Sequence, residues 1–392
     1  MSRKFFSVEQ RKLLVCVSLV FIISRGVVLG GVIFGEKKVP VNDVPYRWDL
    51  PQSRLAPLFR WDTGFYLDIC KNGYSFDTSL KTKSNAIFFP LYPMIVRTIH
   101  KMTSIEIPLL GVLLSNLFFI LSLYFLFKLV KEGIDHQIAF LTILYLSLFP
   151  TALFFSTMYT ESLFLLLAIL TFVFLRNKRW VQTGIVGFLA GLTRVNGITL
   201  TFPILYSVYS TWRENKKITP GAIWAFLSPV CGLGTFMVYL WLRFGEPVAF
   251  VTGLMPFKRQ PVGFFPFVIL KNVILSFNLM ITKGASVVAL NVWFVILFIL
   301  CALYLFKKLP KEYFYFLVAN LLVFSSTTVY LPGIEEGALY STTRYLAVLF
   351  PGFIALGKIG NKFPKVNIVI IIIFSNLLLL YSALYSRWYW VG

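Results

Sequence analysis

Charged side chains are scarce in this sequence, and acidic ones are the scarcest. Of its 392 residues only 14% are Asp, Glu, Lys or Arg, and 16 are acidic. A water-soluble chain of this length has roughly a quarter of charged residues and does not hide so many apolar ones, here 58%, in its core. The composition therefore excludes a soluble globular protein.

Histidine and cysteine are also few, with two and four residues. The sequence has no Cys-x-x-Cys pair and no His-rich spacing, so it indicates no metal site. We expect no metal and no cofactor. Three of the four cysteines lie in apolar runs, where a buried free thiol is the simplest interpretation.

What the sequence has instead is a series of apolar runs, many near the length of about twenty residues with which a helix crosses the hydrocarbon layer. We predict an all-α polytopic integral membrane protein with a single domain over residues 1–392, and no internal repeat is visible. The first run lacks a small-residue cleavage site and is predicted to remain as an uncleaved span. The eleven candidate spans are 13–34, 107–129, 138–155, 160–175, 181–193, 197–211, 221–242, 285–306, 313–330, 345–357 and 366–386.

Basic residues are unevenly distributed between the loops. With the N-terminus in the cytoplasm, the short cytoplasmic segments hold 18 Lys and Arg, whereas the short outer loops hold only Arg194 and Arg344. The formal net charge of +21 thus reflects membrane orientation, and no nucleic acid is expected as a partner. Two long outer segments remain: 35–106, a first extracytoplasmic loop with interfacial helices, and 243–284.

Two regions allow more than one topology. The apolar stretch 262–283 is interrupted by Lys271 and Asn272, and counting it as a span would place the next lysines outside. We therefore favour an interfacial or re-entrant segment there. The segments 181–193 and 197–211 are short, and a hairpin that does not fully cross is their alternative.

Unusual polar residues gather at the outer ends of the predicted spans. The bilayer centre is almost free of ionisable groups apart from Arg25, for which an acidic partner, a lipid phosphate and a catalytic task are all open. A transporter would carry polar groups near the midplane, so the pattern favours a site at the level of the lipid headgroups. The residues at the outer ends are Asp62, Glu161, Arg194, Asn196, Glu246, Glu335, Glu336 and Arg344.

The densest polar segment surrounds Asp62, which follows Arg60 and Trp61 and precedes a predicted amphipathic helix at about 63–71. One interpretation is that Asp62 only caps this helix, and the other is a general base held at headgroup level. Further on, Pro90 and Pro93 predict a membrane-surface element anchored by aromatic residues and exclude a regular long helix through 90–93.

Two arginines are candidates for binding a phosphate. Arg194 interrupts an apolar stretch, and Arg344 stands at the outer start of a span. Each either extends its charge to the outer surface or pairs with an anionic group. Glu161 lies in a Tyr-Thr-Glu-Ser segment that is also typical of a capping turn.

Six short segments occur in order over nearly the whole chain. They are Arg60-Trp61-Asp62 with Phe65 and Gly73-Tyr74; Phe88-Phe89-Pro90-Leu91-Tyr92-Pro93; Tyr159-Thr160-Glu161-Ser162; Thr193-Arg194-Val195-Asn196-Gly197; Gly245-Glu246-Pro247-Val248-Ala249-Phe250; and Trp388-Tyr389-Trp390-Val391-Gly392. Together they resemble the PIG-V family, the GPI mannosyltransferase II type of glycosyltransferase with the GT-C membrane fold. The last segment is similar to the ends of prokaryotic members.

The resemblance implies an inverting transfer of mannose from a polyprenyl- or dolichyl-phosphate donor to a lipid or glycan acceptor. It places this reaction at the extracytoplasmic face of a bacterial or archaeal cytoplasmic membrane, or at the luminal face of the endoplasmic reticulum in a eukaryote. The catalytic residue that it implies is the acid of the first outer loop, here Asp62. To donor phosphate and substrate binding we assign Arg60, Trp61, Glu161, Arg194, Asn196, Glu246 and Arg344.

In the predicted reaction Asp62 accepts the proton of the acceptor hydroxyl, and Arg194 and Arg344 stabilise the leaving phosphate. No nucleotide diphosphate is involved, so we expect activity without a metal. The segment Val251–Phe257 departs from the Gln/Trp pattern of prokaryotic members, which leaves the acceptor and the sugar open. The alternatives are a GT-C transferase for another lipid-linked sugar and, in a different class, a flippase or transporter of lipid-linked sugars.

Overall fold

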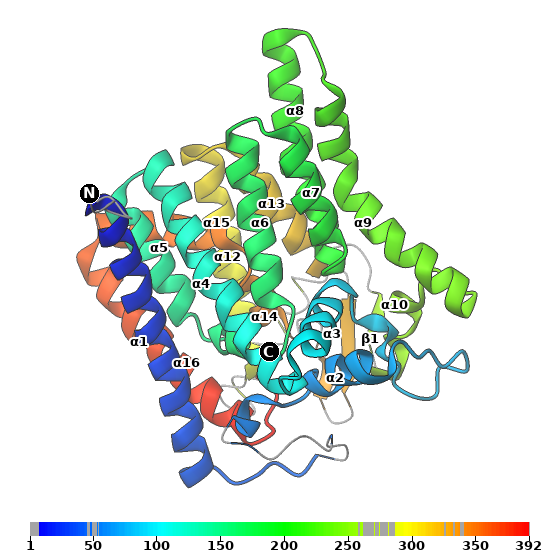
Figure 1. Ribbon diagram of the computed structural model, residues 1–392. Coiled ribbons are helices and arrows are strands. Elements are labelled where there is room, and N and C mark those ends of the chain that lie inside the picture. Colours follow the sequence, from blue (N-terminus) through cyan, green and yellow to red (C-terminus); the bar gives the residue numbers. More distant parts are fainter. Residues whose placement is uncertain are drawn as a thin grey trace, which may run out of the picture.

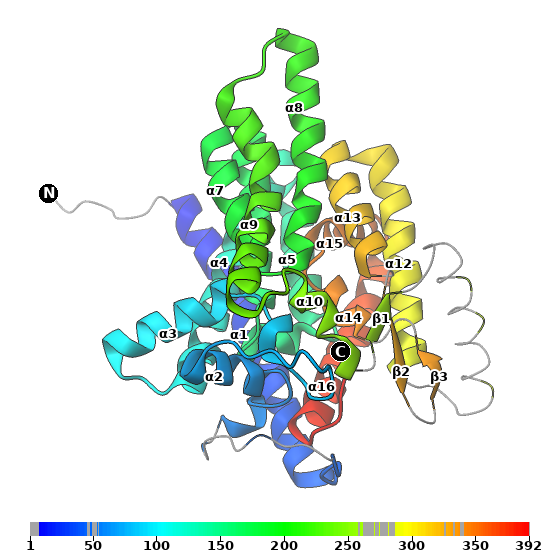
Figure 2. The same cartoon turned by 90° about the vertical axis from the view of Figure 1, so that its right-hand side faces the viewer.

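The computed structural model describes residues 8–44, 48, 53, 55–257, 259–261, 270, 274, 281, 287–324, 327–331, 334–337 and 341–391. Figure 1 shows a bundle of helices in which α8 (Thr201–Asn215) and α9 (Pro220–Phe244) project at one end. Short helices and a small sheet gather at the other end, as the view in Figure 2 confirms.

Five helices in the described ranges are long and apolar enough to cross a membrane. They are α1 (Val8–Lys38), α4 (Ile107–Gly133), α9, α12 (Val287–Lys308) and α16 (Pro364–Ser386). Large apolar side chains such as Ile22 and Leu242 are exposed on them, as expected where lipid is the solvent. The chain is a multi-pass integral membrane protein.

The predicted count of eleven spans is not confirmed, because several apolar stretches are continuous in sequence but broken as helices. The stretch 138–155 ends its helix at Leu148, one residue before Phe149, whose conformation is restricted by Pro150. The shorter helices are α5 (His136–Leu148), α6 (Glu161–Arg176), α7 (Trp180–Gly191), α8, α13 (Lys311–Phe324), α14 (Thr342–Leu346) and α15 (Phe350–Lys362).

A small antiparallel sheet corrects the all-α prediction. Its strands β1 (Arg259–Pro261), β2 (Thr327–Leu331) and β3 (Ile334–Gly337) lie in that order, with Gln260 opposite Thr328. The predicted span 313–330 therefore stops as a helix at Phe324 and continues as a strand. The rest of the described secondary structure is helical.

Helices α1 and α16 lie side by side along one edge of the bundle (Figure 1). A Cβ on Gly31 or Gly35 of α1 would lie 2.4 Å from a carbonyl oxygen of α16, that of Leu379 or Ala383 respectively. These two glycines, four residues apart, therefore let the two backbones approach, which is how small residues join helices in a membrane.

Aromatic rings fill the core between the remaining helices. Phe149, fully buried, has its ring 5.1 to 6.0 Å from the rings of four phenylalanines on α12, α15 and α16. These partners are Phe294, Phe298, Phe353 and Phe374. This packing fixes the helices that flank the candidate active site.

Segment 35–106, the predicted first outer loop, contains short helices. They are η1 (Ala56–Leu58), α2 (Thr63–Asn72), η2 (Asn85–Ile87) and α3 (Leu91–Thr103). Helix α2 matches the helix predicted at 63–71. No long helix runs through 90–93: α3 begins at Leu91, with Pro90 as its cap and Pro93 in its first turn, where no intrahelical N–H bond is lost.

Segment 243–284, the predicted second outer segment, is only partly described. Its helix α10 (Ala249–Thr252) packs against the first segment, where the Phe250 ring lies 5.5 Å from the Phe89 ring. A 3-10 turn, η5 (Met255–Phe257), follows. The predicted interfacial segment 262–283 lies outside the described residues except for Leu270, Ile274 and Ile281.

Asp135 caps α5, and its removal is expected to lower the free energy of unfolding by about 1 kcal/mol at neutral pH. Its Oδ1 accepts the backbone N–H groups of Gln137 (2.7 Å) and Ile138 (3.1 Å). These backbone hydrogen bonds, chiefly that from Ile138, lower the pKa of Asp135. Thermal unfolding of Asp135→Ala measures the effect, and Asp135→Asn, which retains a capping oxygen, is the control.

The same pKa shift sets the pH dependence of this effect. Because the pKa is lower in the folded protein, the ionised cap stabilises fully above the unfolded-state pKa and less as pH falls through the folded-state value. The difference between Asp135→Ala and the native protein should therefore shrink in acid. A difference that grows in acid would contradict the assignment.

Candidate active site

Asp62 does not cap α2. It has helical backbone angles, and its side chain forms no capping hydrogen bond. Its Oδ2 instead lies 2.7 Å from Nη1 of Arg344, a residue 282 positions away at α14. The carboxylate is 19% exposed, and within the described structure its Oδ1 has no hydrogen-bond partner. The interpretation of Asp62 as a helix cap alone is therefore excluded.

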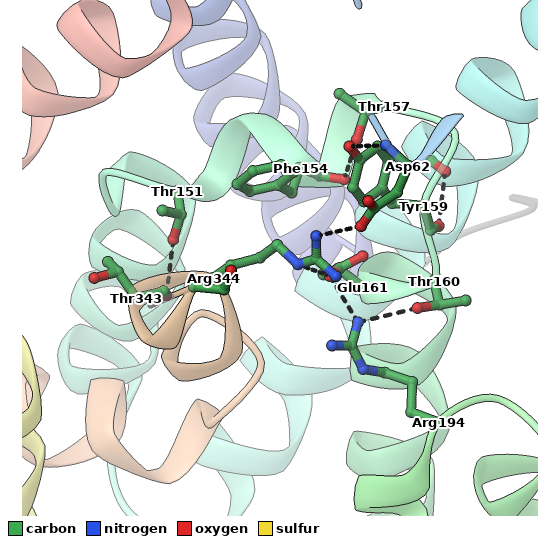
Figure 3. A network of polar contacts seen from close by, with 12 residues as sticks. Asp62, Thr151, Phe154, Thr157, Tyr159, Thr160, Glu161, Arg194, Thr343 and Arg344 are labelled. Atoms are coloured by element: carbon green, nitrogen blue, oxygen red, sulfur yellow. Dashed lines mark hydrogen bonds and ion pairs between the residues drawn. The ribbon is translucent and has the colours of Figure 1, made fainter. Parts of the chain in front are cut away.

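Arg344 also joins Asp62 to two further charged residues. Its Nε lies 2.7 Å from Oε1 of Glu161, and the same oxygen lies 2.6 Å from Nη1 of Arg194. Figure 3 shows these side chains converging from separate parts of the chain, with Arg344 between Asp62 and Glu161. We call Asp62, Glu161, Arg194 and Arg344 the acid–arginine network.

The network is electroneutral and almost fully buried. The Glu161 side chain has no exposed surface, and those of Arg344 and Arg194 are 7% and 8% exposed. Isolated charges at such positions would be strongly destabilising, so pairing is what allows them there. Glu161 is in addition the first residue of α6, where the helix dipole favours a carboxylate. Its Oε2 is buried without a hydrogen-bond partner.

Two tyrosines hold the backbone that carries Asp62. The Tyr159 hydroxyl accepts the N–H of Asp62 (3.0 Å) and donates to the Arg60 carbonyl (3.1 Å). The Tyr385 hydroxyl, from α16, donates to the same carbonyl at 3.1 Å. Between them Trp61 has a φ of +53°, a left-handed conformation that a bulky residue keeps only when its surroundings hold it. No sequence pattern singles out Tyr385, whereas Tyr159 belongs to the Tyr-Thr-Glu-Ser segment.

Arg60 and Trp61 lie beside the network without joining it. The Arg60 guanidinium donates to the Phe59 carbonyl (3.2 Å) and the Ser386 carbonyl (3.1 Å), so it ties η1 to α16. The Trp61 ring contacts the rings of Trp388 (5.9 Å) and Trp390 (5.5 Å). Trp390 also lies 5.5 Å from the Arg344 guanidinium, so these aromatic rings pack against the network.

Asn196 and Glu246 are not part of the network. Asn196 donates to Oδ1 of Asn320 on α13 (3.2 Å), and Asn320 in turn donates to Thr199 (2.7 Å). This buried polar group connects the turn after Arg194 to α13. The Glu246 carboxylate accepts the N–H of Val248 (3.3 Å) in its own loop. The side chains of Glu335 and Glu336 lie outside the described structure.

Arg25 contributes to the loop that leads into Glu161. Its Nη1 donates to the Ala152 carbonyl (3.0 Å) and to the Ser156 hydroxyl (2.7 Å), both in the 3-10 helix η3 (Ala152–Ser156). Its guanidinium lies over the Phe119 ring at 4.7 Å. Of the partners left open for Arg25, an acidic side chain does not occur among the described residues. The described part of the chain also contains no group of three His, Cys, Asp or Glu that could hold a metal ion.

Comparisons with known proteins identify relatives of this region. Residues 48–239 match the family model described as mannosyltransferase (PIG-V). The match includes Asp62, Glu161 and Arg194, whereas Arg344 lies beyond it. The GPI mannosyltransferase 2 of Drosophila pseudoobscura pseudoobscura is 29% identical over 190 residues, which cover 44% of this chain and 40% of that protein.

Two structures of the Archaeoglobus fulgidus oligosaccharyltransferase are also similar. The complex with Zn and sulfate has a TM-score of 0.44 at 15% sequence identity, covering 94% of this chain and 53% of that one. The apo form has a TM-score of 0.43 at 11% identity, with coverage of 93% and 56%.

Proposed function

We propose that this chain, which belongs to the PIG-V mannosyltransferase family by its residues 48–239, transfers mannose from a polyprenyl- or dolichyl-phosphate donor to a lipid or glycan acceptor. The transfer takes place at the extracytoplasmic face of the membrane. The chain covers 40% of the length of its GPI mannosyltransferase 2 relative, and its own acceptor is part of this proposal.

The observation that carries the proposal is the state of Asp62. One carboxylate oxygen is fixed by Arg344 at 2.7 Å, and the other has no partner in the described structure. A carboxylate with one oriented oxygen and one free oxygen, 19% exposed beside a buried network, suits a general base for an acceptor hydroxyl. The Tyr159 and Tyr385 hydroxyls fix the backbone at this residue. The carboxylate is therefore held in a defined position for an acceptor hydroxyl.

The reaction that follows is a single displacement. The acceptor oxygen forms a bond to the anomeric carbon while its proton passes to Asp62. The bond between the anomeric carbon and the phosphate oxygen breaks on the opposite side, and the lipid phosphate leaves with the electron pair. Configuration is therefore inverted, and no covalent sugar–protein intermediate forms.

The departing phosphate requires positive charge, and the arginines of the network have donors left for it. Each guanidinium has five N–H groups. Arg344 uses Nη1 and Nε for Asp62 and Glu161, and Arg194 uses Nη1 for Glu161 and Thr160. Because both arginines are already paired with carboxylates, we expect them to orient the phosphate through their remaining N–H groups while the network stays intact.

The proposal is tested by transfer from a defined donor. The purified full-length protein is incubated with polyprenyl-phosphate mannose carrying a radiolabel and with a panel of lipid and glycan acceptors. Parallel reactions use the polyprenyl-phosphate derivatives of glucose, galactose and arabinose as donors. Labelled product from the mannose donor alone is the expected result. Transfer from another sugar alone would contradict the mannose assignment, and vectorial movement of the donor without product would indicate a flippase.

Replacing Arg194 by Lys is expected to raise the KM for the donor about 10-fold or more, with a smaller effect on kcat. Lysine keeps the charge but lacks the planar set of donors, and a hydrogen bond to a charged group contributes about 1.5–3 kcal/mol. Arg344→Lys should behave similarly. Steady-state kinetics measure the effect, with Arg243→Lys, an exposed arginine at the end of α9, as the control. An unchanged KM in both network variants would remove the arginines from donor binding.

A further inference from the structure

A cavity lies at the end of the bundle away from the acid–arginine network. It has a volume of about 290 Å³ and is lined where α4 and α6 end and α13 begins, with Ser207 of α8 on its wall. Helix α6 connects the two places, since it begins at Glu161 and ends at Arg176, about 22 Å apart at the rise of an α-helix. The cavity is therefore separate from the candidate active site.

The lining of this cavity has an apolar part and a cationic part. Ile134, Phe172, Leu175 and Tyr313 supply hydrocarbon and aromatic surface, and the Phe172 and Tyr313 rings are stacked at 5.1 Å. Arg176 and Lys178 supply two positive charges. A free inorganic anion would not use the apolar surface, whereas an amphiphile with a charged head uses both parts.

Lys178 is held in place without being neutralised. Its ammonium donates to the hydroxyls of Thr211 (2.8 Å) and Ser207 (3.2 Å). Its backbone has a φ of +53°, the left-handed position that ends α6, where the N–H of Arg179 donates to the Phe174 carbonyl (2.9 Å). Arg176 donates to the carbonyls of Leu129 (3.2 Å) and Glu132 (2.7 Å). Within the described ranges neither cation forms an ion pair with a carboxylate.

The net charge of the lining indicates what the ligand carries. The single carboxylate on the cavity wall is that of Glu312, so two cations and one anion leave one positive charge. A phosphodiester has one negative charge and matches this excess. We propose that the cavity binds the phosphodiester headgroup of a membrane phospholipid, with the phosphate at Lys178 and Arg176 and the first part of its acyl chains on the apolar lining.

The alternative is that these basic residues only set membrane orientation, as basic residues near span ends do in general. Lys216 separates the two explanations. It is also a lysine at this end of the bundle, it also has a left-handed backbone (φ +54°), and its ammonium lies 5.3 Å from a tryptophan ring, compared with 5.5 Å for Lys178. Lys216 does not line the cavity, and it is therefore the matched control.

The test measures lipid binding to the delipidated full-length protein by native mass spectrometry. Dioleoylphosphatidylglycerol is titrated, with dioleoylglycerol, which lacks the phosphate, and inorganic phosphate in parallel. We expect saturable binding of the phospholipid, a dissociation constant about tenfold higher in Lys178→Gln, and no change in Lys216→Gln. Equal losses in both variants, equal binding of dioleoylglycerol, or equal binding of inorganic phosphate would each overturn the proposal.

A second variant keeps the proposal testable if Lys178→Gln does not fold. Ile134→Trp places a large ring on the apolar side of the cavity and leaves both cations unchanged. Loss of phospholipid binding in this variant, with unchanged sugar transfer, is the expected result. Retained binding would overturn the assignment of the ligand to this cavity.

Discussion

Changing Asp62 to Asn is expected to lower kcat for sugar transfer by a factor of about 10²–10⁴, the usual contribution of a general base. Asparagine has nearly the same shape as aspartate, but its amide does not accept the proton of the acceptor hydroxyl. The KM for the donor should change far less, because Asp62 acts on the acceptor. Steady-state kinetics on the purified, folded variant measure both quantities.

Asp77→Asn is the control for this experiment, because it makes the same chemical change in the same segment, 35–106. Asp77 organises its own loop, where its carboxylate accepts hydrogen bonds from Ser79 and Thr82, among others. These bonds lower the pKa of Asp77 well below its ordinary value. The control should leave kcat unchanged. Wild-type kcat in Asp62→Asn would show that another group takes the proton.

Changing Glu161 to Gln is expected to lower the free energy of unfolding by about 3–5 kcal/mol, as for other buried ion pairs that lose one partner. The change leaves Arg194 and Arg344 buried with Asp62 as the remaining carboxylate. Thermal unfolding in detergent measures the loss. Glu132→Gln, which removes an exposed pair with Lys128 at 3.9 Å, should cost only about 0–1 kcal/mol.

A compensating change shows whether the loss is due to charge. In the double variant Glu161→Gln and Arg194→Met, one acid and one base are removed together, so the network is neutral again. This variant should be more stable than Glu161→Gln alone. If the second change only adds to the destabilisation, the ion pairs are not what stabilises this region.

Charged side chains in apolar stretches are rare in a membrane protein, so the members of the acid–arginine network could be singled out from the sequence. Asp62, Glu161, Arg194 and Arg344 stood out as polar interruptions near the ends of apolar stretches, and the structure brings all four together. Their pairing was not predictable. Asp62 and Arg344 are 282 positions apart, and no local sequence pattern predicts which acid forms an ion pair with which arginine.

Local rules failed where tertiary contacts compete with them. Asp62 has the sequence position of a helix cap, yet its carboxylate binds Arg344. Leaving a buried guanidinium without a carboxylate costs more free energy than leaving the first N–H groups of a helix without a side-chain cap. Arg60 has the features of a ligand-binding residue, yet it donates to backbone carbonyls. Tyr385 gave no signal, because a tyrosine in an apolar run resembles any other core residue until its hydroxyl partner is known.

The contact between α1 and α16 has a consequence for the order of events during synthesis. More than three hundred residues separate the two helices, so at about 5–20 residues per second α1 waits roughly 15 to 65 s for this partner. In that interval the surface of α1 at Gly31 and Gly35 lacks its contact with α16. Arg344 and Tyr385 emerge at the same late stage. A product that stops before Arg344 therefore contains Asp62 and Glu161 with only Arg194 to neutralise them.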